Sequence, residues 1–145
     1  MPEVRQAGLA DADVIAGLAA ELAQSFAFRR ADFDVSYPAL LAERNACVFV
    51  AEQDGDCMGY LLGYWHLTFF ANGPVGWVEE VMVRREHRGR GIGRDLMSAF
   101  ERRAVARECS MVALATRRAA PFYLALGYQE SAAYLRKVLS REAAL

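Results

Sequence analysis

The chain has 145 residues, of which 54% are hydrophobic and 24% charged, a balance typical of one folded domain with a sizeable core. Its net charge is −1, which excludes a global electrostatic attraction to nucleic acid or to an acidic membrane surface. We therefore expect a single domain over residues 1–145, with neither a nucleic-acid nor a membrane partner.

The cysteines and the N-terminus bear on the cellular compartment. Cys47, Cys57 and Cys109 are odd in number and form no C-x-x-C pair, which favours buried free thiols over a zinc site or a disulfide framework. Met1-Pro2-Glu3 lacks the basic and then apolar run of a signal peptide, and no stretch approaches the roughly 18 apolar residues of a membrane helix. The sequence thus predicts a cytoplasmic protein without a metal.

The N-terminal region predicts one strand and two helices. Residues 4–7 read as a short strand, and Asp11 or Asp13 can cap a helix whose apolar positions recur at helical spacing. Residues 25–44 are rich in aromatic side chains but are interrupted by charged residues and by Pro38. A short second helix over residues 37–44 fits this stretch.

A hairpin follows. Residues 46–52 read as a strand, residues 54–56 as a turn and residues 57–70 as a long partner strand. Gly59 and Gly63 interrupt the partner strand, and glycines inside strands mark bulges or a close approach of the backbone.

A turn at residues 71–74 then leads to a central strand over residues 76–83. The adjacent side chains of Phe69 and Phe70 cannot share one face of a strand. We therefore expect one of the two phenylalanines to line a cavity or an interface.

The stretch 81–94 holds the strongest pattern in the chain. It ends the apolar strand, becomes rich in arginine and alternates three glycines, Gly89, Gly91 and Gly93, before an amphipathic helix over residues 91–108. Glycines let the backbone approach a ligand, and the first N–H groups of a helix lack partners within it. Because the helix dipole and the arginines add positive potential, we expect a ligand that carries phosphates.

Two common phosphate-binding motifs do not fit this loop. A P-loop requires a lysine, which the stretch lacks, and a dinucleotide fingerprint requires Gly or Ala where Arg94 or Leu96 stands. The pattern that does match is Arg-x-x-Gly-x-Gly over residues 88–93, preceded by Val-x-Val over residues 81–83.

The C-terminal part predicts three further elements. Residues 110–115 read as a short buried strand, parallel to the central strand because a whole helix connects the two. Residues 119–128, Ala-Ala-Pro-Phe-Tyr-Leu-Ala-Leu-Gly-Tyr, read as a short helix ended by glycine. Residues 128–130 and 134–139 are expected to close the sheet as an antiparallel pair.

The glycine–arginine loop and the run at 119–128 resemble the two signatures of the GCN5-related N-acetyltransferase (GNAT) family. The resemblance implies an α/β fold with a mixed, mostly antiparallel central sheet of about six to seven strands, flanked by about four helices, and a V-shaped splay between the two central parallel strands. It also implies an acetyl-CoA-dependent enzyme that transfers an acetyl group to a primary amine by direct attack in a ternary complex. A small-molecule amine is favoured over a protein.

For the cosubstrate acetyl-CoA, the resemblance implies that the backbone of Val81 and Val83 binds the pantetheine arm and that N–H groups across residues 88–94 bind the pyrophosphate. Relatives often carry an asparagine where this chain has Thr116, and Arg117 or Arg118 can compensate for it with charge. The expected contacts are Val81, Met82, Val83, Arg88, Gly89, Arg90, Gly91, Ile92, Gly93, Arg94 and Thr116.

The catalytic residues are expected beside this strand. Glu79 and Glu80 directly precede Val81, on opposite faces of the strand, and two carboxylates on an apolar strand need a reason. We assign Glu79 as general base or water-positioning residue and Glu80 to a pocket that attracts cations; the reverse stays open, with His66 as an alternate base. Tyr123 holds the position of the family's motif tyrosine and is the expected general acid.

The acceptor side is expected where aromatic residues gather near the acidic pair. The predicted substrate-binding residues are Glu80, Trp65, Phe69, Phe70 and Tyr134, with Phe26 and Phe28 as further contacts. A function of a different class also stays open, a catalytically silent acyl-CoA-binding sensor or interaction module, although the intact Glu79 and Tyr123 argue against it. Whether the chain forms a homodimer is open as well.

Overall fold

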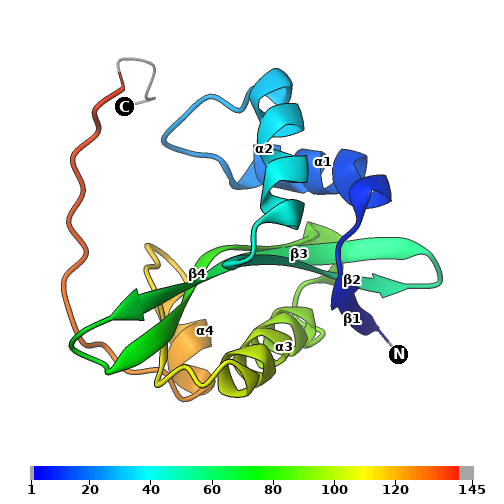
Figure 1. Cartoon of the computed structure of the whole chain (residues 1–145). Coiled ribbons are helices and arrows are strands. Elements are labelled where there is room, and N and C mark those ends of the chain that lie inside the picture. Colours follow the sequence, from blue (N-terminus) through cyan, green and yellow to red (C-terminus); the bar gives the residue numbers. More distant parts are fainter. Residues whose placement is uncertain (1, 141–145) are drawn as a thin grey trace.

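The protein is described by a computed structural model that covers residues 2–140 (Figure 1). Residue 1 and residues 141–145 of the predicted domain lie outside this range. The elements in chain order are β1 (Glu3–Gln6), α1 (Ala12–Leu22), α2 (Arg30–Ala42), β2 (Ala46–Gln53), β3 (Asp56–Thr68), β4 (Gly73–Val83), α3 (Ile92–Ala106), β5 (Val112–Leu114) and α4 (Ala120–Ala125), with short 3₁₀ turns at Leu9–Asp11 and Arg85–His87.

The five strands form one mixed sheet in the order β1-β2-β3-β4-β5. The first four pair antiparallel, and β5 joins β4 in parallel, as the intervening α3 requires. Helices α1 and α2 cover one face of the sheet, and α3 and α4 cover the other (Figure 1). The α/β architecture predicted from the sequence is confirmed, and residues 2–140 form five strands, fewer than the six to seven predicted.

Each face of the sheet has its own apolar core. The core under α3 centres on Phe100, which is fully buried and stacks on Trp65 with ring centroids 4.4 Å apart. The other core joins α1 and α2 to the opposite face of β2 and β3 and contains Tyr37 and Tyr60. Because strand side chains alternate between faces, β3 contributes to both cores.

The second helix begins earlier than the predicted range of 37–44. Its first turn is stabilised by ion pairs from Arg30 to Asp34 (2.7 Å) and from Arg29 to Asp32 (2.6 Å), in the i,i+4 and i,i+3 spacings that favour helices. The rings of Phe33 and Tyr37 stack at 5.1 Å one turn apart. These local contacts extend the helix on the N-terminal side of the proline.

The predicted closing pair, residues 128–130 and 134–139, does not form, since the structure assigns no strand between residues 126 and 140. The sequence of 134–139 explains this absence. Two apolar, two basic and two apolar residues follow one another, so a strand there would carry charge on both faces. Leu135 is accordingly 89% exposed.

The predicted strand over residues 57–70 is too long, because β3 ends at Thr68 and Phe69 and Phe70 lie beyond it. The Thr68 hydroxyl donates to the Gly73 carbonyl (2.7 Å) and accepts from the Ala71 N–H (3.3 Å), which closes a turn. Both phenylalanines lie in this turn and are exposed. Over residues 2–140, none of the helices combines the length and apolar character needed to cross a membrane.

Candidate functional site

The site begins where β4 and β5 part. The two strands pair only from Gly76 to Val78 on β4 and from Val112 to Leu114 on β5. Beyond Val78, β4 continues to Val83 with β3 on one side and no described strand on the other. This is the predicted splay, and it leaves backbone groups around Val81 and the Val83 N–H available to an extended ligand.

The glycine–arginine loop leads from this open edge into α3. Gly89 and Gly91 have φ angles of 78° and 82°, a left-handed conformation that favours glycine. Gly91 immediately precedes the helix, whose first N–H groups have no partner within it. Arg88 Nε donates to the Val83 carbonyl (3.1 Å), which ties the loop back to β4.

The predicted acetyl-CoA contacts divide into two kinds. Ile92 turns its side chain into the core and so offers only backbone to a ligand, whereas Met82 packs against the other core but is half-buried. Gly93 packs closely, because a Cβ there would lie 3.1 Å from the Phe122 ring. Arg94 is exposed, and Arg90 Nη1 lies 3.0 Å from Nδ1 of His87. The positive charge of the loop thus faces outward.

A cavity of about 740 Å³ opens beside the splay, between the sheet and the segment that joins α1 to α2. Its floor is residues 78–81 of β4. Its walls are residues 114–119 after β5 and residues 23–29 between the helices, which include Phe26 and Phe28. Tyr123, Arg136 and side chains of α1, α2, β2 and β3 complete the lining of this space, which we call the main cavity.

A bulge in β4 places both acidic residues on this cavity. Val78 pairs with Gly63 and Glu80 pairs with Leu62, so Glu79 has no partner on β3. The extra residue breaks the side-chain alternation, and Glu79 and Glu80 both line the cavity. The expectation that they lie on opposite faces was wrong, because it assumed an unbroken strand.

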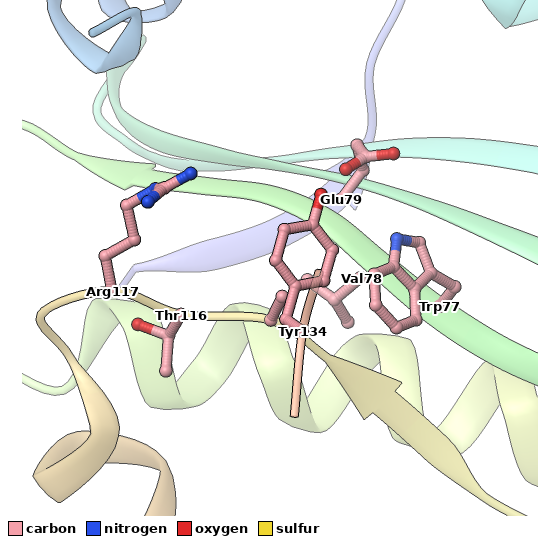
Figure 2. A pocket seen from close by; sticks show the side chains of 7 residues that line it. Trp77, Val78, Glu79, Thr116, Arg117 and Tyr134 are labelled. Atoms are coloured by element: carbon pink, nitrogen blue, oxygen red, sulfur yellow. The ribbon is translucent and has the colours of Figure 1, made fainter. Parts of the chain in front are cut away.

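The two carboxylates have different surroundings. Oε1 of Glu80 accepts a hydrogen bond from the Tyr60 hydroxyl at 2.7 Å. Burial of the ring, followed by the nearby Glu80 charge, raises the pKa of Tyr60 far above its usual value, so Tyr60 is a donor at neutral pH. Glu79 is exposed and also borders a smaller cavity of about 150 Å³ with Thr116, Arg117 and Tyr134 (Figure 2).

Tyr123 reaches the main cavity from α4. Its ring is partly buried and meets Phe122 and Tyr128 edge-on, with centroids 4.9 and 5.9 Å away. Burial raises the pKa of the Tyr123 phenol, so the hydroxyl keeps its proton at neutral pH. Thr116 supports this helix, because its Oγ1 accepts the Ala119 N–H at 3.0 Å.

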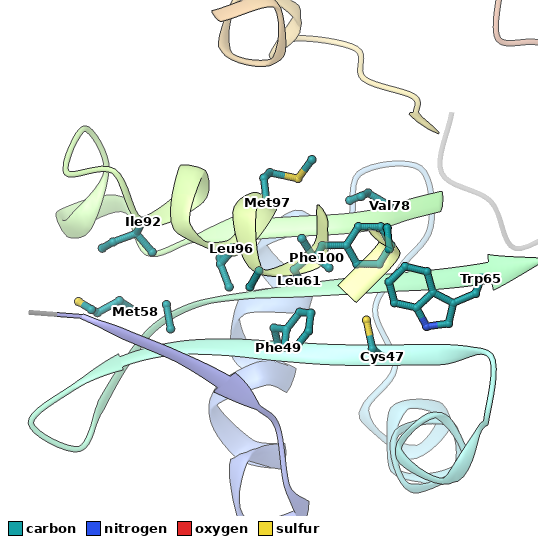
Figure 3. Close-up of a cluster of buried hydrophobic side chains, with 13 residues drawn as sticks. Cys47, Phe49, Met58, Leu61, Trp65, Val78, Ile92, Leu96, Met97 and Phe100 are labelled. Carbon is teal, nitrogen blue, oxygen red and sulfur yellow. The ribbon is translucent and has the colours of Figure 1, made fainter. Parts of the chain in front are cut away.

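The aromatic residues predicted for the acceptor side separate in the structure. Tyr134 lines the smaller cavity. The Trp65 ring is 3% exposed and belongs to the core under α3 (Figure 3). Trp65 also borders a separate open hollow of about 750 Å³ together with His66, and neither Glu79 nor Glu80 lines this hollow. Phe69 and Phe70 project from the β3–β4 turn and line neither the main nor the smaller cavity. Sequence reasoning missed Tyr60, and only the pairing of β3 with β4 could have revealed it.

The family model "Acetyltransferase (GNAT) family" matches residues 16–128. The chain therefore belongs to the GNAT family of acetyltransferases, as its two sequence signatures predict. No curated protein matches the chain at a significant level.

Solved structures share the fold over nearly the whole chain. Glucosamine-6-phosphate N-acetyltransferase from Arabidopsis thaliana is 17% identical with a TM-score of 0.85, covering 97% of this chain and 99% of that one. The aminoglycoside N-acetyltransferase AAC(6')-Iy in complex with CoA is 21% identical with a TM-score of 0.82, covering 94% and 95%. Ribosomal-protein-alanine N-acetyltransferase from Brucella melitensis biovar Abortus 2308 is 25% identical with a TM-score of 0.73, covering 97% and 99%.

Proposed function

We propose that this protein is an acetyl-CoA-dependent N-acetyltransferase that acetylates a primary amine, small rather than protein-borne, by direct attack in a ternary complex. The observation that carries the proposal is one cavity in which the open edge of β4, two carboxylates and the Tyr123 phenol meet. Structural neighbours named for glucosamine-6-phosphate and aminoglycoside substrates support an amine acceptor.

The chain offers two features to acetyl-CoA. The unpaired edge of β4 can bind the pantetheine arm through the backbone of Val81 and Val83, as an added strand would. The N–H groups at the start of α3, together with the arginines of residues 88–94, suit the pyrophosphate. The Val81 amide is the proposed donor to the carbonyl oxygen that gains negative charge, a contribution of about 3–4 kcal/mol where such donors have been removed.

The two carboxylates have different proposed roles toward the amine: one attracts it and the other accepts its proton. Glu80 is held by Tyr60 and provides a fixed negative charge for the ammonium group. Glu79 forms no hydrogen bond or ion pair with the described residues and is free to accept the proton, directly or through a water molecule. An amine with a pKa near about 10 must lose this proton before it can attack.

Tyr123 supplies the proton that the departing thiolate needs. Its phenol stays protonated because burial raises its pKa, and it lines the same cavity as both carboxylates. Transfer of a proton by a positioned side chain contributes about a hundredfold or more to the rate.

The test is release of CoA from acetyl-CoA across a panel of primary amines. We expect turnover with at least one amine, and we expect Tyr123→Phe to lower kcat roughly ten- to a hundredfold while acetyl-CoA affinity is kept. Tight acetyl-CoA binding without turnover on any amine would instead support an acyl-CoA sensor. An unchanged rate in Tyr123→Phe would remove the general-acid role.

A further inference from the structure

Charged side chains of both signs line the main cavity, and their positions constrain the acceptor. The seven are Arg29, Asp32, Glu79, Glu80, Arg117, Arg118 and Arg136. Arg29 and Asp32 form an ion pair with each other at 2.6 Å. The remaining five comprise two carboxylates and three guanidinium groups.

These five charges are separated rather than paired. Both carboxylates lie on the bulge of β4, whereas Arg117 and Arg118 lie between β5 and α4. Within residues 2–140, neither of these two arginines forms a hydrogen bond or an ion pair. In Figure 2 the Arg117 guanidinium and the Glu79 carboxylate stand on either side of the Tyr134 ring.

Arg136 brings a third guanidinium to the same region from the C-terminal segment. Its Nη1 donates to the Ser25 hydroxyl at 2.9 Å, which joins this segment to the chain between α1 and α2. A guanidinium has five N–H donors, so the Ser25 contact leaves most of them available to a ligand.

The pyrophosphate of acetyl-CoA has binding features of its own, so Arg117 and Arg118, which the sequence suggested as partners of acetyl-CoA, are available to a second anion. The glycine–arginine loop at residues 84–94 and the start of α3 provide the phosphate-binding features, and none of those residues lines this cavity. Arg117, Arg118 and Arg136 instead share the cavity with the two carboxylates proposed to receive the amine.

We propose that the acceptor is a zwitterion, an amine that also carries an anionic group, either a carboxylate or a phosphate ester. This inference rests on the proposed function. The ammonium group binds at Glu79 and Glu80, and the anion binds at Arg117, Arg118 and Arg136, since the planar fork of arginine suits both kinds of oxyanion. Polycationic amines are poor acceptors because the arginines repel them.

The experiment compares acceptors that differ in the anionic group. L-Phenylalanine is compared with L-phenylalaninamide, O-phosphoethanolamine with ethanolamine, and spermidine serves as a polycation. Two readouts are used, kcat/KM from CoA release and calorimetric binding of each amine to the protein saturated with CoA. The variants are Arg117→Gln, Arg118→Gln and Arg136→Gln, with Arg102→Gln as the matched control, because Arg102 is exposed on α3 and lines neither cavity.

We expect the anionic member of at least one pair to exceed its neutral partner by roughly tenfold or more in kcat/KM, and the preferred pair identifies the anion. Each cavity variant should lower this ratio, by about tenfold or more for a lost charged hydrogen bond, while Arg102→Gln leaves it unchanged. Equal or better use of the neutral amines or of spermidine would overturn the inference. The inference would also be overturned if the cavity variants raised the KM for acetyl-CoA but left the ratio of kcat/KM between anionic and neutral amines unchanged.

The binding readout separates this inference from the proposed function. Suppose that no amine is acetylated, that an anionic amine binds the CoA complex more tightly than its neutral partner, and that the arginine variants lose that preference. The anion-binding site formed by the arginines is then supported and the acetyltransferase activity is refuted. If turnover occurs without a preference for anionic amines, the acetyltransferase activity is supported and the anion-binding site is refuted. If no amine is acetylated or bound, both fall.

Discussion

Replacing Tyr60 with Phe tests whether Glu80 takes part in the reaction. The Tyr60 side chain is 2% exposed, and its hydroxyl donates to Glu80 Oε1 at 2.7 Å. The substitution keeps the ring and removes a single oxygen atom, so the packing of the core is retained. What is lost is one hydrogen bond to a charged carboxylate that faces the cavity.

The size of the effect follows from the surroundings of Glu80. A hydrogen bond to a charged group contributes about 1.5–3 kcal/mol. Glu80 is only half-buried and lines a cavity, so water can replace part of the bond, and we expect a loss of about 1.5 kcal/mol in the free energy of unfolding. For a chain of this length, that loss lowers the Tm by roughly 3–6 °C.

Tyr128→Phe is the matched control. The Tyr128 hydroxyl donates to Oε2 of Glu101 at 2.6 Å, and Glu101 lines neither described cavity. Both variants should lose similar stability in thermal unfolding. Only Tyr60→Phe should also raise the KM for the amine, by roughly three- to tenfold, because Glu80 is no longer held in place. Amine KM is measured by CoA release at saturating acetyl-CoA.

Two results would refute this reasoning. An amine KM that stays unchanged in Tyr60→Phe, while stability falls, would show that Glu80 does not bind the amine. Equal rises of KM in both variants would show that general loosening of the fold, rather than the position of Glu80, governs acceptor binding.

Three further predictions address the base, the core and a buried thiol. Glu79→Gln should shift the pH–rate profile toward alkaline pH, and an unshifted profile would exclude Glu79 as the base. Gly63→Ala should cost about 3 kcal/mol or more in urea unfolding, because its Cβ would lie 2.2 Å from the Phe100 ring, whereas Gly17→Ala, with open space around it, should add up to about 1 kcal/mol; equal effects would contradict the packing argument. Burial raises the pKa of Cys47 from 9.0 to about 11, so between these pH values the unfolded thiol loses its proton while the folded one keeps it. Stability should then fall by about 2–3 kcal/mol over that range, and a Cys47→Ala variant with an equally steep decline would refute this account.

The parts of the fold that the sequence predicted are those encoded by neighbouring residues. The strand, loop and helix around Gly91 could be predicted directly, because glycines before an amphipathic run indicate where the helix starts. The predicted helix over residues 91–108 is observed as Ile92–Ala106. The parallel pairing of β4 and β5 also followed, because a helix must connect parallel neighbours.

One feature that the sequence did not reveal depends on residues far apart in the chain, whereas two other differences are local. Tyr60 and Glu80 are twenty residues apart in sequence, and only the register of β3 against β4 brings them together. The predicted closing pair of residues 128–130 and 134–139 does not form, because the paired apolar and basic residues of 134–139 give no apolar face. Phe69 and Phe70 were placed on a strand, although the strand ends at Thr68, whose hydroxyl closes the following turn.

The bulge at Glu79 explains why the predicted orientation of the two carboxylates was wrong. In a regular strand, consecutive carboxylates point to opposite faces, and one of them would have met the core under α3. The unpaired residue instead lets both face one cavity, and Gly63, opposite Val78, has room only for a hydrogen because Phe100 fills the space beyond it. The tight packing at Gly63 and the shared orientation of the two carboxylates therefore occur at the same irregularity in the pairing of β3 with β4. A substitution that forces Gly63 away from Phe100 should disturb the positions of both carboxylates as well as the core.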